Sequence, residues 1–245
     1  MTTAGQARNA MGRLPLAGVE LILDGGTPVV LAPHPDDEVI GCGGLLMAAV
    51  TAGLRPLVVF VTDGSGSHPN SRAFPRPALI DLRQREAREA AAILGIEADR
   101  LCFLGIRDTA APTRGSAFEA AVAAIGFLIA SERRPVIFAP WRHDPHGDHR
   151  AVHEMATVLA ARRGARHLSY PVWGWTLPAD RKLGAAPIDG WRLALGEHRQ
   201  RKLSALRAHR SQCSDLIDDD PEGFRLDEAT LNAMLSDNEV FLVNR

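Results

Sequence analysis

Short, wholly apolar segments alternate with longer segments of helical period along most of this 245-residue chain. An apolar segment of this length suits a strand that is buried on both faces, as in a parallel sheet. The alternation therefore predicts an α/β fold: a Rossmann-like, open, mostly parallel sheet with helices on both faces. The expected strands lie at 28–33, 56–64, 100–106, 135–140 and 166–175, and the expected helices at 41–53, 78–95, 116–132, 147–164 and 197–212.

The pattern indicates a single domain over residues 1–245, because neither an internal repeat nor a low-complexity linker interrupts it. Hydrophobic residues make up 46% of the chain, which is enough for a sizeable core. Residues 1–25 show only weak periodicity, so we expect a partly ordered lead-in there. The segment 178–191 departs from the alternation, and we expect it to form a hairpin or a flap.

Charge and cysteine content narrow the partners and the compartment. The 28 Lys and Arg residues nearly balance the 29 Asp and Glu residues, so the chain lacks the basic character typical of nucleic-acid binding. Its 3 cysteines form no CxxC pair, which argues against a disulfide framework or a cysteine-based zinc site. We expect neither a membrane span nor a signal peptide, since no apolar run is long enough. The sequence therefore predicts a soluble, cytoplasmic protein.

Polar residues gather directly after the expected strands. HPDDE (34–38) follows the first strand, TDGS (62–65) the second, RD (107–108) the third and RHDPHGDH (142–149) the fourth. Right-handed crossovers place the carboxyl ends of parallel strands along one edge of the sheet, where ligands bind in such folds. These segments are therefore expected to converge on one site.

Two of these segments have the composition of a divalent-metal site. His34 and Asp37 are three residues apart across a turn, so both side chains can face one point. Asp36 must then point elsewhere, toward whatever binds beside the metal. The second segment offers His143, His146 and His149, with His153 four residues further on. Two histidines, one carboxylate and an open position suit a catalytic divalent cation.

Simpler explanations account for single residues of these segments but not for all of them together. Asp36 and Asp148 could cap helices, and Glu38 would be favourable in a first helical turn. The glycines at 41, 43 and 44 do not make a convincing dinucleotide fingerprint, since carboxylates occupy the turn where a pyrophosphate needs backbone N–H groups. We expect these glycines to let the helix pack closely on the sheet.

PHPDDE (33–38), TDG (62–64) and HGDHRAVH (146–153) together resemble the motifs of the PIG-L/LmbE-like de-N-acetylases. That family includes the N-acetylglucosaminyl-phosphatidylinositol deacetylases and the deacetylases of mycothiol and bacillithiol metabolism. The resemblance runs from about residue 28 to about residue 212, with LRQREAREAAAILG (82–95) and HRSQ (209–212) as further matches. It implies a metal-dependent hydrolase that removes an N-acetyl or other N-acyl group from an amino sugar or its conjugate.

The resemblance also implies roles for individual residues. His34, Asp37 and His149 would bind one divalent metal, with zinc as the first choice and iron, manganese or cobalt as alternatives. Asp36 would be the general base that takes a proton from metal-activated water. Protonated His146 would stabilise the oxyanion and act as the acid partner.

Arg83 and Asp108 would contact the substrate on the same grounds, and Asp63 could hydrogen-bond a sugar hydroxyl. The long loop 62–77 could act as a lid. Trp173 and Trp175 could stack on a sugar ring, although core packing explains them equally well. One departure from the family concerns Gly147, since the commonest form of the second motif has proline there.

Three other functions stay open at this point. An amidase that releases a larger acyl group would differ only in its pocket, which the sequence does not show. A metal phosphoesterase would need a second metal, for which His143, Asp144, Asp63 and His153 are the candidates. A non-catalytic sugar-binding module would have lost a ligand or the base, yet every expected position is filled. The expected partner is a small amino-sugar substrate, without nucleic acid or membrane, and a homo-oligomer is compatible with the sequence.

Overall fold

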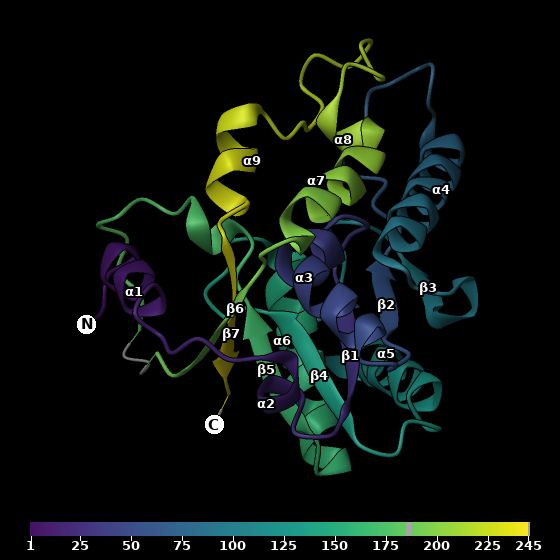
Figure 1. Ribbon diagram of the computed structural model, residues 1–245. Helices are drawn as coiled ribbons and strands as arrows, with labels where there is room; N and C mark the ends of the chain where they lie inside the picture. The colour runs from purple at the N-terminus through teal and green to yellow at the C-terminus, as the bar shows by residue number, and fades with distance from the viewer. Residues whose placement is uncertain (185–187, 245) are drawn as a thin grey trace.

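The structure, a computed structural model, describes residues 1–184 and 188–244 (Figure 1). Within these residues the core element is a 7-stranded sheet in the order β3-β2-β1-β4-β5-β7-β6. Neighbouring strands from β3 to β5 run parallel, and β7 pairs antiparallel with both β5 and β6. The strands are β1 (Thr27–Ala32), β2 (Leu57–Thr62), β3 (Leu101–Ile106), β4 (Pro135–Pro140), β5 (Arg166–Tyr170), β6 (Gly190–Ala194) and β7 (Asn238–Val243). The predicted α/β fold is confirmed, with an added antiparallel edge.

Helices lie near the predicted positions but differ at several ends. They are α1 (Ala4–Met11), α2 (Val19–Leu23), α3 (Asp37–Thr51), α4 (Arg76–Leu94), α5 (Gly115–Leu128), α6 (Gly147–Arg163), α7 (His198–Ala208), α8 (Arg210–Cys213) and α9 (Glu228–Met234), with short 3-10 helices η1 (Ala98–Arg100) and η2 (Trp173–Trp175). Helix α3 begins at Asp37 rather than at 41, so its first turn holds carboxylates, which suit the helix dipole. The predicted helix 197–212 is two helices that meet at His209.

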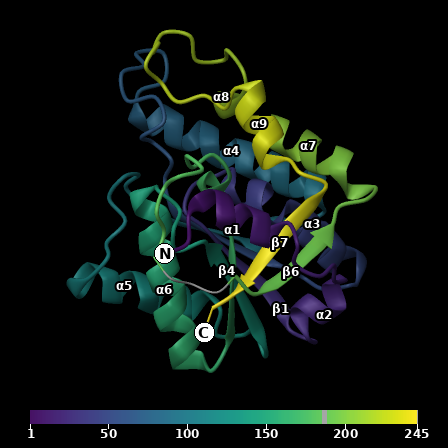
Figure 2. The ribbon, with the colours of Figure 1, turned by 90° about the vertical axis from the view of Figure 1, so that its left-hand side faces the viewer.

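Alternate residues of the parallel strands enter two hydrophobic cores, one on each face of the sheet. Val30 and Ala32 of β1 join Phe60 of β2 in the core that also includes residues of α3, α4 and α7. Val29 and Leu31 face the other way, into the core with α5 and α6. Figure 2 shows these helical layers on opposite sides of the sheet. Burial on both faces explains why these strands are wholly apolar.

Residues 1–25 contain two helices, where the weak periodicity predicted only a partly ordered lead-in. Thr3 and Gln6 form a capping box at the start of α1. Met11 packs with Val240 and Leu242 of β7. The short apolar face of α1 is therefore completed by a strand from the other end of the chain, which no local pattern can reveal.

Glycines in α3 allow the close packing that the sequence predicted. A Cβ at Gly41 would lie 2.1 Å from the Tyr170 ring, and a Cβ at Gly44 would lie 2.2 Å from the side chain of Leu195. The hydroxyl of Tyr170 donates to the carbonyl of Leu31 (2.8 Å), which ties β5 to β1 below the helix. This close approach places the first turn of α3 at the carboxyl edge of the sheet.

The segment 178–191, predicted as a hairpin or a flap, falls partly outside the described residues, which omit 185–187. Its last two residues begin β6. Among the helices that the structure describes, none is long and apolar enough to cross a membrane.

Candidate active site

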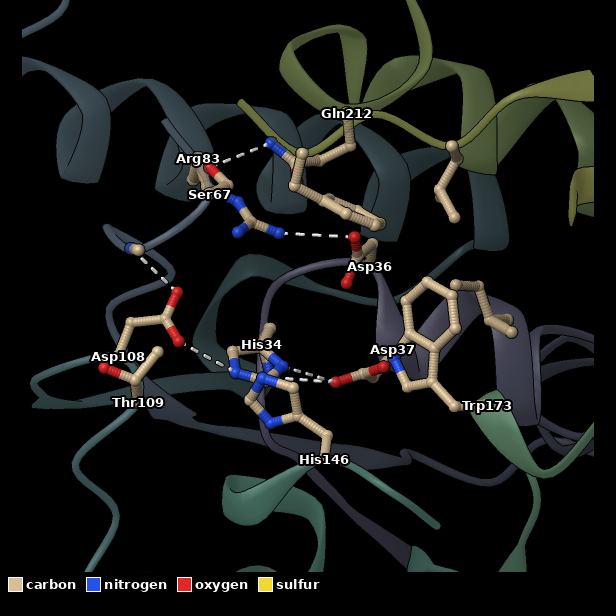
Figure 3. A pocket seen from close by; sticks show the side chains of 14 residues that line it. His34, Asp36, Asp37, Ser67, Arg83, Asp108, Thr109, His146, Trp173 and Gln212 are labelled. Atoms are coloured by element: carbon tan, nitrogen blue, oxygen red, sulfur yellow. Dashed lines mark hydrogen bonds and ion pairs between the residues drawn. The ribbon is translucent and has the colours of Figure 1, made fainter. Parts of the chain in front are cut away.

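A cavity of about 170 Å³ opens at the edge of the sheet where the parallel strands end (Figure 3). The polar segments that follow β1, β3 and β4 contribute to its lining, and the loop after β2 contributes Gly66 and Ser67, just past TDGS (62–65). The contributing residues include His34, Asp36, Asp37, Ser67, Asp108 and His146. The convergence expected from the topology is therefore present.

His34, Asp37 and His149 bring ligand atoms to one buried point. Asp37 Oδ2 lies 3.1 Å from Nδ1 of His34 and 3.2 Å from Nε2 of His149. The His149 side chain is fully buried, and neither ring nitrogen finds a well-aligned hydrogen bond within the described chain. A buried ring nitrogen of this kind beside a carboxylate suits a divalent cation. His34 and His149 share a group of mutually close ligand atoms with His146, whereas Asp37 belongs to no such group among the described residues. The metal set of His34, Asp37 and His149 therefore stays a prediction.

A second set of ligand atoms overlaps the first. Ligand atoms of His34, His146 and His149 lie within 4.8 Å of one another, as do those of His34, Asp108, His146 and Asp148. Nε2 of His34 is 3.1 Å from a carboxylate oxygen of Asp108 and 3.1 Å from one of Asp148. The excess of carboxylates around one imidazole favours a positive charge at this point.

The pKa values of the centre point the same way. Burial lowers the pKa of His34, but hydrogen bonds to three carboxylates outweigh burial and raise this pKa well above its usual value. Burial raises the pKa of Asp37, but His149 and His34 outweigh it and hold this pKa well below its usual range. The pKa of His149 is raised to about 9, against the effect of burial, by Asp37 and Asp144. The centre therefore stabilises positive charge and disfavours protonated carboxyls.

Asp36 places its carboxylate in the cavity from a strained backbone. Its φ of 128° lies in a region that residues with a side chain rarely adopt. Glu38 accepts the Asp36 N–H (2.9 Å), while Arg83 donates to the Pro35 carbonyl and to Asp36 Oδ2 (3.3 Å for the latter). Although Asp36 precedes α3 at the N-cap, its side chain makes no capping hydrogen bond within the described chain. Helix capping therefore does not explain this aspartate.

Burial raises the pKa of Asp36 to about 6, against the opposing effect of Arg83. A carboxylate with a pKa near neutrality can both accept and return a proton. Behind Asp36, Nε2 of His209 lies 3.3 Å from Oε1 of Glu38, and both side chains are fully buried. The sequence pointed to HRSQ (209–212) as a family element without assigning a role to its histidine. The structure places that histidine behind the predicted base.

His146 caps α6 with its own ring. Its Nδ1 accepts a hydrogen bond from the N–H of Asp148 (3.2 Å), which leaves the proton of the neutral ring on Nε2. Burial, followed by the charges of His34 and His149, lowers the pKa of His146. This direction favours a neutral ring that donates from Nε2, and the role of His146 as a protonated acid, which the resemblance implied, stays a prediction. A Cβ at Gly147 would meet nothing within 4 Å in the described structure, so the turn has room for the family's usual proline.

Asp144 links the centre to the opposite side of the cavity. Its Oδ1 lies 3.2 Å from Nδ1 of His149. Its Oδ2 accepts the N–H groups of Val172 (3.2 Å), Trp173 (2.8 Å) and Gly174 (3.3 Å). The sequence suggested Asp144 only as a ligand for a second metal. Its position five residues before His149 is a local signal, but the partner segment at 172–174 could not be read from the sequence.

The three predicted substrate contacts lie in different places. Arg83 and Asp108 line the cavity, whereas Asp63 does not. The Asp63 carboxylate accepts the N–H of Asp108 (3.1 Å) and the hydroxyl of Ser65 (2.7 Å), and it pairs with Arg76 (2.7 Å). Asp63 therefore shapes the loops beside the cavity, and its direct contact with a substrate stays a prediction.

The four residues considered for a second metal do not converge. Asp144 and Asp63 are engaged in the contacts just described. Nδ1 of His153 lies 3.0 Å from a backbone carbonyl, and the ring of His143 packs edge-on against an indole. Within residues 1–184 and 188–244, neither group of close ligand atoms includes any of the four. A two-metal centre is therefore not favoured.

Trp173 lines the cavity, while Trp175 packs against the hydrophobic cores. Loop 62–77 is fastened to the segment after α8, because Asp219 accepts the N–H of Arg72 (2.7 Å) and Asp220 that of Asn70 (2.8 Å). Its role as a lid stays a prediction.

Comparison with known proteins identifies the family of this chain. Residues 29–160, more than half of the chain, match the family described as PIG-L: GlcNAc-PI de-N-acetylase. The chain belongs to the PIG-L family. The resemblance carried by the sequence motifs is thereby confirmed.

Similar proteins agree with this PIG-L assignment. A probable N-acetyl-alpha-D-glucosaminyl L-malate deacetylase 2 from Bacillus cereus is 27% identical over 195 residues, 78% of this chain and 86% of the relative. The N,N'-diacetylchitobiose deacetylase from Pyrococcus horikoshii has a TM-score of 0.65 at 22% identity. The aligned region covers 97% of this chain and 90% of the deacetylase chain. The zinc-inhibited form of teicoplanin deacetylase Orf2 has a TM-score of 0.61 at 18% identity, over 88% and 97% of the two chains. At these identities the two structures show the shared fold alone.

Proposed function

We propose that this PIG-L family protein is a metal-dependent hydrolase that removes an N-acyl group from an amino sugar or an amino-sugar conjugate. One observation carries the proposal: the Asp36 carboxylate lines the cavity beside His34 and Asp37 on a strained backbone. Strain of this kind costs about 1–3 kcal/mol and persists only where the surroundings enforce it. Here Arg83 and Glu38 enforce it, which supports a catalytic use of this carboxylate.

His34, Asp37 and His149 would hold one divalent ion, with zinc as the first choice and iron, manganese or cobalt as alternatives. When bound, the ion supplies Lewis acidity to the amide carbonyl and lowers the pKa of a water molecule. Two imidazoles and one carboxylate leave coordination positions open for these purposes. The excess of carboxylates at the centre supports a divalent rather than a monovalent charge.

Asp36 accepts a proton from the attacking water as the water oxygen bonds to the amide carbon. Arg83 keeps this carboxylate in place, since it holds both Asp36 and the preceding carbonyl. The Nε2–H of His146 donates to the carbonyl oxygen as negative charge develops on it. Asp36 then returns the proton to the amide nitrogen and the carbon–nitrogen bond breaks. A free amine and a carboxylic acid leave, and the acid loses its proton to the solvent.

Polar side chains on one side of the cavity suit an amino-sugar ring. Arg83 and Asp108 line it, and the N–H of Gly66 is held against Asp108 (2.8 Å). We assign sugar hydroxyls to this side, with Asp63 acting through the loops that it organises. Phosphate esters are less suited, because a phosphoesterase would need a second metal and its candidate ligands lie apart.

The test combines metal content with amine release. Protein stripped by a chelator is reloaded with one equivalent of zinc, iron, manganese or cobalt and assayed with a panel of N-acetyl amino sugars and conjugates. Excess zinc is avoided, since a zinc-inhibited form is described for the structural neighbour Orf2. We expect about one ion per chain and amine release that stops on chelation. Two ions per chain, with phosphate-ester hydrolysis and no amine release, would overturn the proposal.

A further inference from the structure

The cavity has two unlike sides. Asp108 and Trp173 lie on opposite sides of the centre formed by His34 and Asp37 (Figure 3). Trp173 belongs to a group of apolar lining residues that we call the apolar wall. The apolar wall consists of Ile40, Trp173, Phe224 and Leu226.

The apolar wall is assembled from three separate parts of the chain. Ile40 comes from the first turns of α3, Trp173 from η2, and Phe224 and Leu226 from the segment between α8 and α9. The rings of Trp173 and Phe224 meet edge to face, with centroids 5.5 Å apart. An edge-to-face aromatic pair is a specific arrangement that adds to simple burial.

Backbone hydrogen bonds hold this wall in place. The Trp173 N–H donates to Asp144 (2.8 Å), the Phe224 N–H to the carbonyl of Ser67 (2.6 Å), and the Leu226 N–H to the carbonyl of Gln212 (2.8 Å). Leu226 and Ile40 are nearly buried, at 3% and 4% exposure, while the two aromatic rings are half-buried at the cavity. The wall is therefore preformed, and its aromatic surface is still available to a ligand.

The scissile amide determines what can meet this surface. An amide is planar and favours the trans arrangement, so its nitrogen substituent and its acyl group extend to opposite sides of the carbonyl carbon. When the sugar lies toward Asp108 and Arg83, the acyl group extends toward Trp173. A sugar ring placed on the apolar wall instead would bury hydroxyl groups against carbon, and unpaired buried hydroxyls are costly.

We propose that the acyl group cleaved by this protein is an apolar chain longer than acetyl, seated on the apolar wall. This inference rests on the proposed N-acyl hydrolase function. The ring centroids of Trp173 and Phe224 lie 5.5 Å apart. Acetyl carries a single methyl group and would cover at most one of these rings, whereas a longer acyl chain can cover both.

The test is a ladder of N-acyl glucosamines (acetyl, butyryl and hexanoyl) with the metal-loaded protein. Kinetics give kcat/KM, and quenching of tryptophan fluorescence gives Kd. Each fully buried methylene is worth a factor of about four, so half-burial of four methylenes predicts a rise of at least about tenfold from acetyl to hexanoyl. A parallel ladder of N-acetylglucosamine alkyl glycosides places the same methylenes on the aglycone instead.

Phe224→Ala removes half of the aromatic pair at a side chain that is not fully buried. We expect it to lower the ratio of hexanoyl to acetyl kcat/KM at least fivefold. Phe127→Ala is the matched control, because Phe127 is 82% exposed on α5, away from the cavity. This control should leave the ratio unchanged.

The outcomes separate the two proposals. Hydrolysis of the acetyl compound with no gain along the acyl ladder would overturn the acyl assignment and leave the hydrolase proposal standing. A rise in kcat/KM along the glycoside ladder alone would assign the apolar wall to the aglycone, and it would also overturn the acyl assignment. Chain-length-dependent binding without hydrolysis of any compound would overturn the hydrolase proposal while supporting the apolar wall as a binding surface.

Discussion

Residues 29–160 and the later part of the chain bury charge in different ways. In the family-matched segment, imidazoles and carboxylates meet at the cavity, and within the described chain His149 is left without a well-aligned hydrogen bond. In the later part, Nζ of Lys202 lies 2.6 Å from Oε1 of Glu239, and both side chains are buried. The Glu239 carboxylate also accepts the N–H groups of Gly44 (2.6 Å) and Leu45 (2.9 Å). Buried polar groups are normally paired, and among the described residues the exceptions beside the cavity include His149 of the first region and His209 and Gln212 of the later part. The first region is organised for chemistry, and the second holds and shapes it.

The largest expected effect distinguishes two adjacent aspartates of the first region. Asp37→Asn should abolish tight metal binding, because it removes the anionic ligand between His34 and His149. Asp36→Asn should keep the metal and lower kcat by about 10²- to 10⁴-fold, the usual contribution of a general base. Metal content by mass spectrometry and steady-state amine release measure both effects. If Asp36→Asn loses the metal while Asp37→Asn retains it, the two roles are reversed.

The second prediction concerns the later region, where stability rather than chemistry should suffer. Glu239→Leu leaves the Lys202 ammonium buried at 2% side-chain exposure without its partner. Removal of one member of a buried ion pair costs about 3–5 kcal/mol of folding free energy. Urea unfolding should show this loss, while the folded fraction at low temperature should keep most of its kcat.

The matched variant is the double change Lys202→Met with Glu239→Leu. The double variant also removes the buried Lys202 ammonium that Glu239→Leu leaves without its carboxylate. We therefore expect the double variant to be more stable than Glu239→Leu alone. Equal instability of the single and double variants would mean that the N–H groups of α3, rather than the ion pair, depend on Glu239.

The site could be predicted where its signals are local. His34, Asp36 and Asp37 lie within one turn, and the rule that parallel strand ends share one edge placed His146 beside them. The supports of these residues could not be predicted, because each depends on a partner far along the chain. Glu38 resembles an ordinary first-turn acid until His209 is seen 3.3 Å away.

The same reasoning explains what was missed in the fold. Strands β1 to β4 are almost wholly apolar, so their pattern alone predicts a doubly covered sheet. Strand β7 was missed because Glu239 interrupts its apolar run. That residue is buried because Lys202 on α7 and the N–H groups of Gly44 and Leu45 on α3 satisfy its carboxylate. Strand β6 was missed because it is short, lies at the sheet edge and buries only two of its five residues, so it carries no continuous apolar run.

The third prediction concerns Asp144, which joins the two regions. Asp144→Asn keeps the shape but removes the charge that faces His149 and the N–H groups of residues 172–174. Loss of a residue that contacts a metal-binding side chain, without touching the metal itself, typically lowers metal affinity about 10- to 100-fold. Competition with a chromogenic chelator measures the affinity, and Asp81→Asn on the exposed side of α4 is the control. An unchanged affinity would show that His149 is held without Asp144.

The smallest effect is a pH dependence where the two regions meet. His167 of β5 packs on His153 of α6, with ring centroids 5.0 Å apart. Burial, followed by the charge of His153, lowers the pKa of His167 to about 3. The unfolded chain has a value of about 6.5, so the unfolded state binds this proton more tightly. The contribution of His167 to stability is therefore constant above about pH 6.5 and falls as the pH decreases toward about 3.

By pH 5, this histidine alone should reduce the free energy of unfolding by about 2 kcal/mol relative to pH 8. His167→Gln should flatten that dependence, because glutamine carries no proton equilibrium in this range and can still meet the Thr157 hydroxyl, which lies 3.4 Å from Nδ1 of the histidine. Urea unfolding at pH 5, 6, 7 and 8 measures the slope. His198→Gln, at the half-exposed start of α7, is the control. A slope that is unchanged in His167→Gln would contradict the prediction. It would assign the acid sensitivity to other histidines whose pKa is lowered by burial, such as His143 and His146, and so to the first region rather than to its junction with the second.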